Sequence, residues 1–279
     1  MGTGRQRKPR TQEDNRPGIW VGYGKLLKLH RDRAGLTQQE LAHTLGYSVE
    51  LVASIEQGRR PAQTAFTEAA EATLNAGGTL AVLQDDVDLA KLPAFFQDFA
   101  LIETEAISRY DFEPLLVPGL LQTEDYARAL FTAHCPPLGD EIIEQHVEAR
   151  LGRQKLLTRT PLVEASFIIG EAALTTMVGG RDVMRAQLQH LLRQSALRNV
   201  EIQFMPADIG FHPGHNGSMV VLETLEHRHV GYIESQDVGR VITDAAKVST
   251  FGLRYGKLRT QALNAEESAR LIERVAGEV

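Results

Sequence analysis

Apolar residues recur at helical spacing in the first part of the chain and form short β-type runs in the second. The first pattern predicts four closely spaced helices, over residues 20–34, 38–45, 49–57 and 62–75. The second predicts strands over residues 162–170, 200–206, 218–225 and 229–235. The chain is therefore expected to place helices in one domain and a sheet in another.

Further helices are expected around those strands. Residues 92–110 read as helical, and the segment that follows is irregular because Pro114 and Pro118 stop a helix from running through it. Additional helical patterns cover residues 140–158, 183–197, 244–262 and 265–277. The predicted fold class is multidomain, an all-α head followed by an α+β domain with a mostly antiparallel sheet.

Changes of pattern along the chain indicate where its parts begin and end. Residues 1–18 are polar and basic and are expected to form a flexible arm, residues 19–84 the helical head, residues 85–94 a linker, and residues 95–279 the α+β domain. The arm carries Arg5, Arg7, Lys8, Arg10 and Arg16. Two interpretations of these charges stay open, contact with a nucleic-acid backbone or minor groove and a plain solvated tail.

The stretch GLTQQELAHTLGYSVELVASIEQGRRP, from Gly35 to Pro61, carries the strongest local signals. Thr37 and Glu40 have the spacing of a capping box at the start of a helix. Gly46 stands where the backbone must turn left-handed between two helices. Ser48 is placed to cap the second helix. Two short helices separated by a tight glycine turn predict a helix-turn-helix, whose second helix fits the major groove of DNA.

An ordinary corner between two helices shares the glycine and the apolar pattern. It explains less well a glutamine at one helix start and an arginine pair after the other helix, which are positions suited to phosphate contacts. The predicted DNA-binding residues are Gln38, Gln39, Ser48, Val49, Glu50, Ser54, Arg59 and Arg60.

From about Gly24 to Leu83 the sequence resembles the XRE (lambda Cro/C1-type) repressor domain, through GLTQQELA, Gly46 and IEQGRRP. The resemblance implies that Gln38 binds a phosphate and that positions 49, 50 and 54 face base edges. It also implies that Arg31 pairs with Glu56 inside the domain, so these two residues are not counted as DNA contacts.

Residues 95–277 resemble the C-terminal domain of a class of actinobacterial regulators that includes the WhiJ-like proteins. The motifs that carry the resemblance are VPGLLQTEDYARAL, EARLGRQ, GEAAL, VGGRDVMRAQLQHLL, FHPGHNGSM and VGYIES. The class implies transcriptional control and a small acidic partner protein. It brings no established ligand or catalytic residue.

Charge sharpens the division between the two parts. The chain is acidic overall, with a net charge of −6, yet residues 1–61 hold 11 Lys and Arg against 6 Asp and Glu. This distribution indicates that the front of the chain contacts DNA. No apolar run approaches the ~20 residues needed to span a bilayer, and the single cysteine, Cys135, suits a reducing cytoplasm.

Histidines and glutamates in the second part suggest two chemical alternatives, a metal site and an acid–base site. His212, His215, His227 and His229 lie close in sequence, but zinc needs three or four converging ligands, and a turn with surface histidines is favoured. Glu171 and Glu234, each at the end of an apolar strand, invite an acid–base role that would also require His212 in the same cleft. No catalytic residue, metal site or cofactor is predicted.

Taken together, the patterns predict a cytoplasmic, homodimeric regulator that binds double-stranded DNA and answers to a small-molecule or protein effector through residues 95–279. A dimer is expected because one short recognition helix reads few bases. The alternative is an antitoxin-like interaction module that binds a small acidic partner and regulates its own operon.

Overall fold

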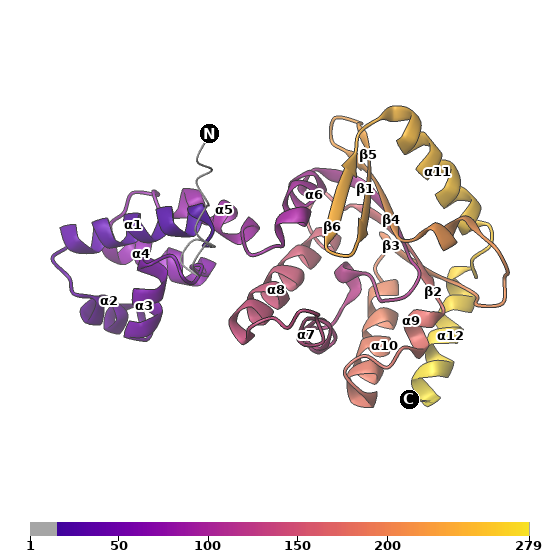
Figure 1. The fold of residues 1–279 in the computed structure, drawn as a ribbon, viewed down its shortest axis with the longest axis horizontal. Helices are drawn as coiled ribbons and strands as arrows, with labels where there is room; N and C mark the ends of the chain where they lie inside the picture. The colour runs from indigo at the N-terminus through magenta and orange to yellow at the C-terminus, as the bar shows by residue number, and fades with distance from the viewer. Residues whose placement is uncertain (1–15, 279) are drawn as a thin grey trace, which may run out of the picture. The chain divides into compact units, whose positions relative to one another are not determined.

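The computed structural model describes residues 16–278 of the chain, and it divides between Leu92 and Pro93 into two units (Figure 1). Residues 1–15, most of the predicted basic arm, lie outside the described part. Within it, none of the helices has the length and apolarity needed to cross a bilayer.

Unit 1 is built from helices alone. Its elements are α1 (Gly18–Arg33), α2 (Gln38–Leu45), α3 (Val49–Glu56), α4 (Thr64–Leu74), the 3-10 turn η2 (Ala81–Leu83) and α5 (Gln84–Leu89). They enclose a core in which Tyr23, Leu27 and Phe66 are almost fully buried. Helices α1 and α3 approach closely because Gly24 has no side chain, and a Cβ there would lie 2.3 Å from the carbonyl oxygen of Ile55.

The segment predicted as a linker belongs largely to this core. Residues 84–89 form α5, whose Val87 is fully buried, and the indole of Trp20 donates a hydrogen bond to the Val87 carbonyl at 3.1 Å. The buried hydroxyl of Thr67 donates a hydrogen bond to the side-chain oxygen of Gln84 at 2.5 Å. Apolar and polar contacts therefore hold these residues in unit 1 up to the division after Leu92.

Unit 2 combines a sheet with helices. Its strands are β1 (Ala106–Glu113), β2 (Glu164–Gly170), β3 (Val200–Met205), β4 (Met219–Thr224), β5 (His229–Ser235) and β6 (Val238–Ile242). Its α-helices are α6 (Ala94–Thr104), α7 (Glu124–Thr132), α8 (Asp140–Arg153), α9 (Ala172–Thr175), α10 (Arg181–Ser195), α11 (Ala245–Arg259) and α12 (Ala265–Glu278). Short 3-10 turns are η3 (Gly119–Leu121), η4 (Gln154–Leu157) and η5 (Pro213–Asn216).

The six strands form one sheet in the order β3-β2-β1-β4-β5-β6. Strands β1, β2 and β3 pair in parallel, whereas β1–β4, β4–β5 and β5–β6 pair antiparallel. The predicted fold class, an all-α head and an α+β domain with a mostly antiparallel sheet, is confirmed.

Strand β1 lies in the middle of the sheet and presents different chemistry to its two faces. Phe112 packs with Phe251 and Leu258 of α11 in an apolar core. Arg109 and Asp111 alternate with these positions and point to the opposite face, which α6 and α8 cover. The ion pairs that join Glu103, Arg109, Asp111 and Arg153 lie on this second face.

The expectation of one helix over residues 92–110 is wrong. Helix α6 ends at Thr104, and β1 begins at Ala106. The alternation of Ser108, Tyr110 and Phe112 with charged residues is a strand pattern, and pairing on both edges with β2 and β4 stabilises it. Strand β6 was also missed, because its five residues include a glycine and lack a strong apolar alternation.

Candidate functional site

The turn between α2 and α3 has the geometry that its sequence predicts. The Thr37 hydroxyl accepts from the Glu40 amide at 3.2 Å, and the Glu40 carboxylate accepts from the Thr37 amide at 2.7 Å, so the capping box is complete. Gly46 adopts φ 75°, the left-handed conformation that glycine tolerates. Ser48 caps α3 by accepting from the Leu51 amide at 3.2 Å. These contacts fix the angle at which α3 leaves the body of unit 1.

An ion pair lies behind this turn. Arg31 of α1 donates to both carboxylate oxygens of Glu56 on α3, at 2.5 and 3.0 Å, and both side chains are buried. The hydrogen bond to Glu56 raises the pKa of Arg31 despite burial, so the guanidinium stays charged. Gln38 joins it, because its side-chain amide donates to Glu56 at 2.7 Å. The Arg31–Glu56 pair inferred from the resemblance is therefore present, and Gln38 adds a hydrogen bond to it.

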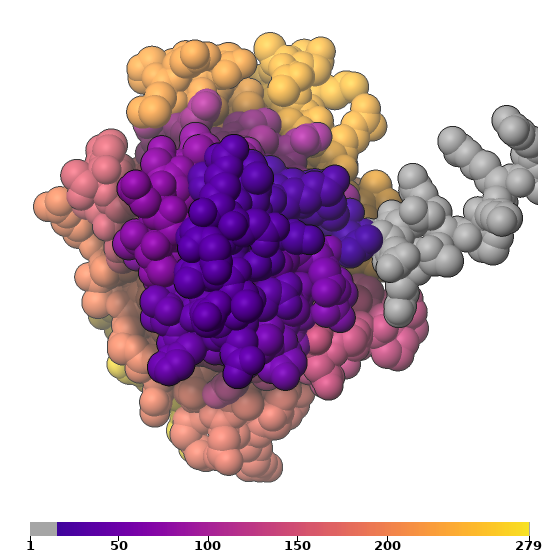
Figure 2. Space-filling view, turned by 90° about the vertical axis from the view of Figure 1, so that its left-hand side faces the viewer, coloured from indigo at the N-terminus to yellow at the C-terminus, as the bar shows by residue number. Residues whose placement is uncertain are grey.

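The outward face of α3 is open. Val49 is 38% exposed, and Ser48 and Glu50 beside it are exposed as well, while Val52 and Ile55 on the inner face are buried. An eight-residue helix with one buried and one open face can lie against another surface through the open one. Figure 2 looks onto unit 1 (indigo), whose atoms form an unbroken surface in this view.

The chain after α3 brings an arginine back to that helix. The Ser54 carbonyl accepts from the Arg59 amide at 2.9 Å, and Gly58 adopts φ 65° to allow this return. The Arg59 and Arg60 side chains are both exposed, and that of Arg59 makes no hydrogen bond or ion pair within residues 16–278. Arg16, the arm residue that the structure describes, is engaged differently, donating to the Gln57 carbonyl at 2.7 Å.

The predicted DNA-binding residues fall into three places. Gln38 and Gln39 begin α2, where the unpaired backbone N–H groups of a helix favour anions. Ser48, Val49 and Glu50 begin α3, with Ser54 one turn farther along. The arginine pair follows α3. The side chains of Gln39, Val49 and Glu50 are exposed and Ser48 caps α3, whereas the Gln38 amide donates one N–H to Glu56.

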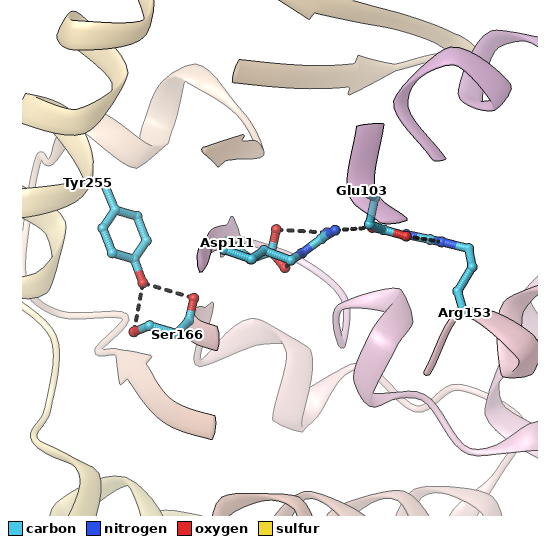
Figure 3. A network of polar contacts seen from close by, with 6 residues as sticks. Glu103, Asp111, Arg153, Ser166 and Tyr255 are labelled. Atoms are coloured by element: carbon cyan, nitrogen blue, oxygen red, sulfur yellow. Dashed lines mark hydrogen bonds and ion pairs between the residues drawn. The ribbon is translucent and has the colours of Figure 1, made fainter. Parts of the chain in front are cut away.

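Unit 2 contains a chain of buried charges that the sequence did not reveal. Arg109 donates to Asp111 at 2.7 and 3.0 Å and also to Glu103, and Arg153 donates to Glu103 at 2.8 Å through each of two nitrogens (Figure 3). Beyond it, the Tyr255 hydroxyl donates to Ser166 at 3.0 Å (Figure 3). The alternation of Arg109 and Asp111 with aromatic residues is the signal that would have placed both on one strand face.

Burial and pairing act in opposite directions on these carboxyl groups. Burial alone would raise the pKa of Glu103, but Arg153 and Arg109 together bring it below its usual value. For Asp111, burial outweighs the attraction of Arg109 and raises the pKa. Burial, with the charges of Asp111 and Glu234, raises the pKa of nearby Glu113 to about 7. The face under β1 therefore holds carboxyl groups in different protonation states near neutral pH.

The residues considered for metal binding or acid–base chemistry do not assemble. Glu171 accepts from the Ala207 amide, Glu234 accepts from the Tyr232 hydroxyl, and His212 stacks near His215; no hydrogen bond or ion pair joins Glu171, Glu234 and His212. His227 occupies a hairpin turn with φ 58° and binds Glu223. Over residues 16–278, no group of three His, Cys, Asp or Glu side chains is placed to hold a metal ion.

Comparison with protein families agrees with this division. Residues 23–83 match the model of a helix-turn-helix domain, and residues 96–274 match the model described as a domain of unknown function (DUF5753). No curated protein and no solved structure matches the chain. The first match identifies unit 1 as a helix-turn-helix domain of XRE type and indicates a DNA-binding regulator.

Proposed function

From the premise that the chain belongs to the DUF5753 family and carries a helix-turn-helix unit ahead of that domain, we propose that it is a sequence-specific transcriptional regulator controlled by an effector through unit 2. The observation that carries the proposal is the open face of α3 beside Arg59, whose side chain makes no hydrogen bond or ion pair within residues 16–278. A buried inner face and a buried ion pair hold that helix in place, so its outer residues are preset for a groove.

The residues divide by what they would contact. Arg59, Arg60, Gln38 and Gln39 suit phosphates, which position the protein without reading sequence. Val49, Glu50 and Ser54 suit base edges. A carboxylate such as that of Glu50 accepts from a cytosine amino group, and an apolar side chain such as that of Val49 contacts a thymine methyl.

Binding as a homodimer follows from the size of this surface. One eight-residue helix covers few base pairs, and two copies on half-sites about 34–36 Å apart restore specificity. Control through unit 2 requires that the effector bind the DNA-competent and incompetent arrangements with different affinity. We further propose that unit 2 recognises this effector without catalysing a reaction.

The test is a gel-shift titration of the full-length protein on DNA from upstream of its own coding region, at several salt concentrations. Arg59→Ala is expected to weaken binding on every sequence and to lower the salt slope by about one, because one phosphate contact is lost. Arg274→Ala, which removes an exposed arginine from unit 2, is the matched control and is expected to leave the slope unchanged. Equal slopes for the native protein and Arg59→Ala would remove Arg59 from the phosphate contacts.

A second candidate is an antitoxin-like module that binds a small acidic protein and regulates its own operon. Large apolar side chains exposed on unit 2 favour it, with Phe211 82%, Leu253 74% and Val238 67% exposed. Co-purification with the product of the adjacent gene, together with loss of the gel shift when that product is added, would favour the antitoxin-like module. A gel shift indifferent to that product favours a small-molecule effector.

A further inference from the structure

Arg150 of α8 lies against the irregular segment before α7 and is held there from several sides. Its Nη1 donates to the Gln122 side-chain oxygen at 2.7 Å, and its guanidinium carbon lies 5.0 Å from the centre of the Phe131 ring. A Cβ added to Gly119 would lie 3.0 Å from Arg150 Cδ, so a glycine leaves room for this side chain. The irregular segment before α7 therefore leaves space for the Arg150 side chain.

Side-chain amides fix that segment in turn. Gln122 donates to the Val117 carbonyl at 2.8 Å, and Gln154 donates to the Gln122 carbonyl at 2.6 Å. From α10, Gln187 accepts from the Thr123 amide and donates to the Leu121 carbonyl, each at 2.7 Å. Because Gln122 is held at both ends, the guanidinium that it receives has one preset orientation.

Arg150 differs from the two arginines near it in having no carboxylate. Arg109 pairs with Glu103 and Asp111, and Arg153 pairs with Glu103. Within residues 16–278, Arg150 makes no ion pair, and its Nε and Nη2 have no hydrogen-bond acceptor. Neither nitrogen is completely shielded from solvent.

The surroundings of Arg150 are short of negative charge. Burial, together with the charge of Arg153, lowers its pKa to about 10, and the carboxylates of Glu234 and Glu103 offset this only in part. A partly buried cation without an opposite charge beside it is costly, and an anion that reached it would form a charge-assisted pair in a poorly solvated place.

We propose that Arg150 anchors a site in unit 2 for a small-molecule oxyanion, a carboxylate or a phosphate group. Two free donors, Nε and Nη2, lie on one edge of a planar guanidinium and match two oxygens of such a group. The preset orientation lowers the entropy lost on binding. The proposal that Arg150 binds an anion does not depend on the function proposed above. The further proposal that this anion is the effector does rest on that function.

A purely structural role is the competing explanation. Arg150 would then serve to hold the segment through Gln122, and its replacement would lower stability without any ligand being involved. Anion affinity distinguishes the two roles, because an arginine with a purely structural role does not bind an anion.

The test is isothermal titration of the full-length protein with inorganic phosphate and, separately, with benzoate, at constant ionic strength set with sodium chloride. Saturable binding of at least one anion is expected, and the anion that binds more tightly identifies the group. Arg150→Gln is expected to weaken that binding by about 10- to 100-fold, the range for a lost hydrogen-bonded charge. Arg198→Gln removes an exposed arginine and is expected to leave binding unchanged.

A second variant covers the case in which Arg150→Gln fails to fold. Gly119→Ala keeps the arginine but displaces its end by a few tenths of an ångström, and weaker anion binding is expected with an unchanged circular dichroism spectrum. Absence of saturable binding of either anion, or equal affinity in the native protein and these variants, overturns the site. A gel shift on the same samples reports DNA binding independently, so failure of the site and failure of the proposed regulation are distinguished.

Discussion

Both units bury charged side chains, but they use them differently. In unit 1, Arg31 meets the buried carboxylate of Glu56, the exposed carboxylate of Asp32 at 2.7 Å and the backbone carbonyl of Leu36 at 2.8 Å. In unit 2, buried Arg109 and partly buried Arg153 share Glu103, while Arg150 has no carboxylate partner within residues 16–278. The ion pair of unit 1 holds α3 against α1, whereas the uncompensated charge of Arg150 is the basis of the anion site proposed above.

The two units are also expected to differ in where substitutions affect stability and binding. The proposed DNA contacts of unit 1 lie on its surface, so substitutions there are expected to change stability little, whereas substitutions in its core lower it. In unit 2, Glu103, Arg109 and Asp111 are buried beside β1, so substitutions there are expected to change folding and binding together.

The largest expected effect is at Glu103. Glu103→Gln removes the carboxylate that two arginines share and leaves their charges buried, which is expected to destabilise unit 2 by about 3–5 kcal/mol. Urea unfolding followed by circular dichroism measures the loss. Glu266→Gln, which removes one partner of an exposed pair with Arg270, is expected to change stability by less than about 1 kcal/mol. Equal effects would contradict the importance of the buried network.

A smaller loss is expected in unit 1, where α1 packs on α3. Gly24→Ala forces a Cβ against the Ile55 backbone and is expected to destabilise unit 1 by about 1–3 kcal/mol. Gly22→Ala, two positions earlier in the same helix, meets nothing within 4 Å and is expected to stabilise by about 0.5–1 kcal/mol, because alanine is the better helix former. Thermal unfolding of both variants measures the difference, and a Gly24→Ala protein as stable as Gly22→Ala would show that the close approach is not required.

The next effect is a pH-dependent change in the stability of unit 2. Because the folded pKa of Glu113 is about 7 against an ordinary 4.5, the folded state binds its proton more tightly than the unfolded state. The resulting stability is complete below about pH 4.5 and is lost as pH rises to about 7. Glu113→Gln, which stays neutral, is expected to gain about 1–2 kcal/mol relative to the native protein between pH 5 and pH 7.5.

Urea unfolding of both proteins at several pH values checks this. The groups that face Glu113 are Asp111 and Glu234, and neither is altered in the variant, so the difference between the two curves reports Glu113 itself. Parallel curves for the two proteins would show that its pKa is the same folded and unfolded.

The smallest expected effect concerns Gln38. Gln38→Ala removes one hydrogen bond to the charged Glu56 and is expected to cost unit 1 about 1–2 kcal/mol of stability. In the native protein the second N–H of the Gln38 amide remains available to a phosphate, so gel shifts on several DNA sequences, measured beside stability, distinguish the two roles. Because glutamine carries no charge, the salt slope is expected to stay the same. Equally weaker binding on every sequence with unchanged stability would assign Gln38 to DNA, and lower stability with unchanged binding would assign it to the ion pair.

Much of unit 1 was predictable because its signals act over a few residues. Thr37 with Glu40, and Gly46 between the two helices, specify a cap and a turn from neighbouring backbone geometry, and the bounds of α2 agree with the expectation. The open face of α3 followed from its helical period. In unit 2 the same kind of reasoning found β2, β3, β4 and β5 but missed β1, because its charged residues interrupt the apolar run.

What the sequence determined by itself is therefore the head: its helices, its turn, its kind of domain and the side of α3 that faces outward. Tertiary structure alone decided that Gln38 binds Glu56, that Arg153 meets a glutamate 50 positions away, and that Arg150 meets none among residues 16–278. Helix caps and periods arise from contacts between near neighbours, which a sequence displays. The partner of a buried charge depends on which distant segments the fold brings together, and no local pattern carries that information.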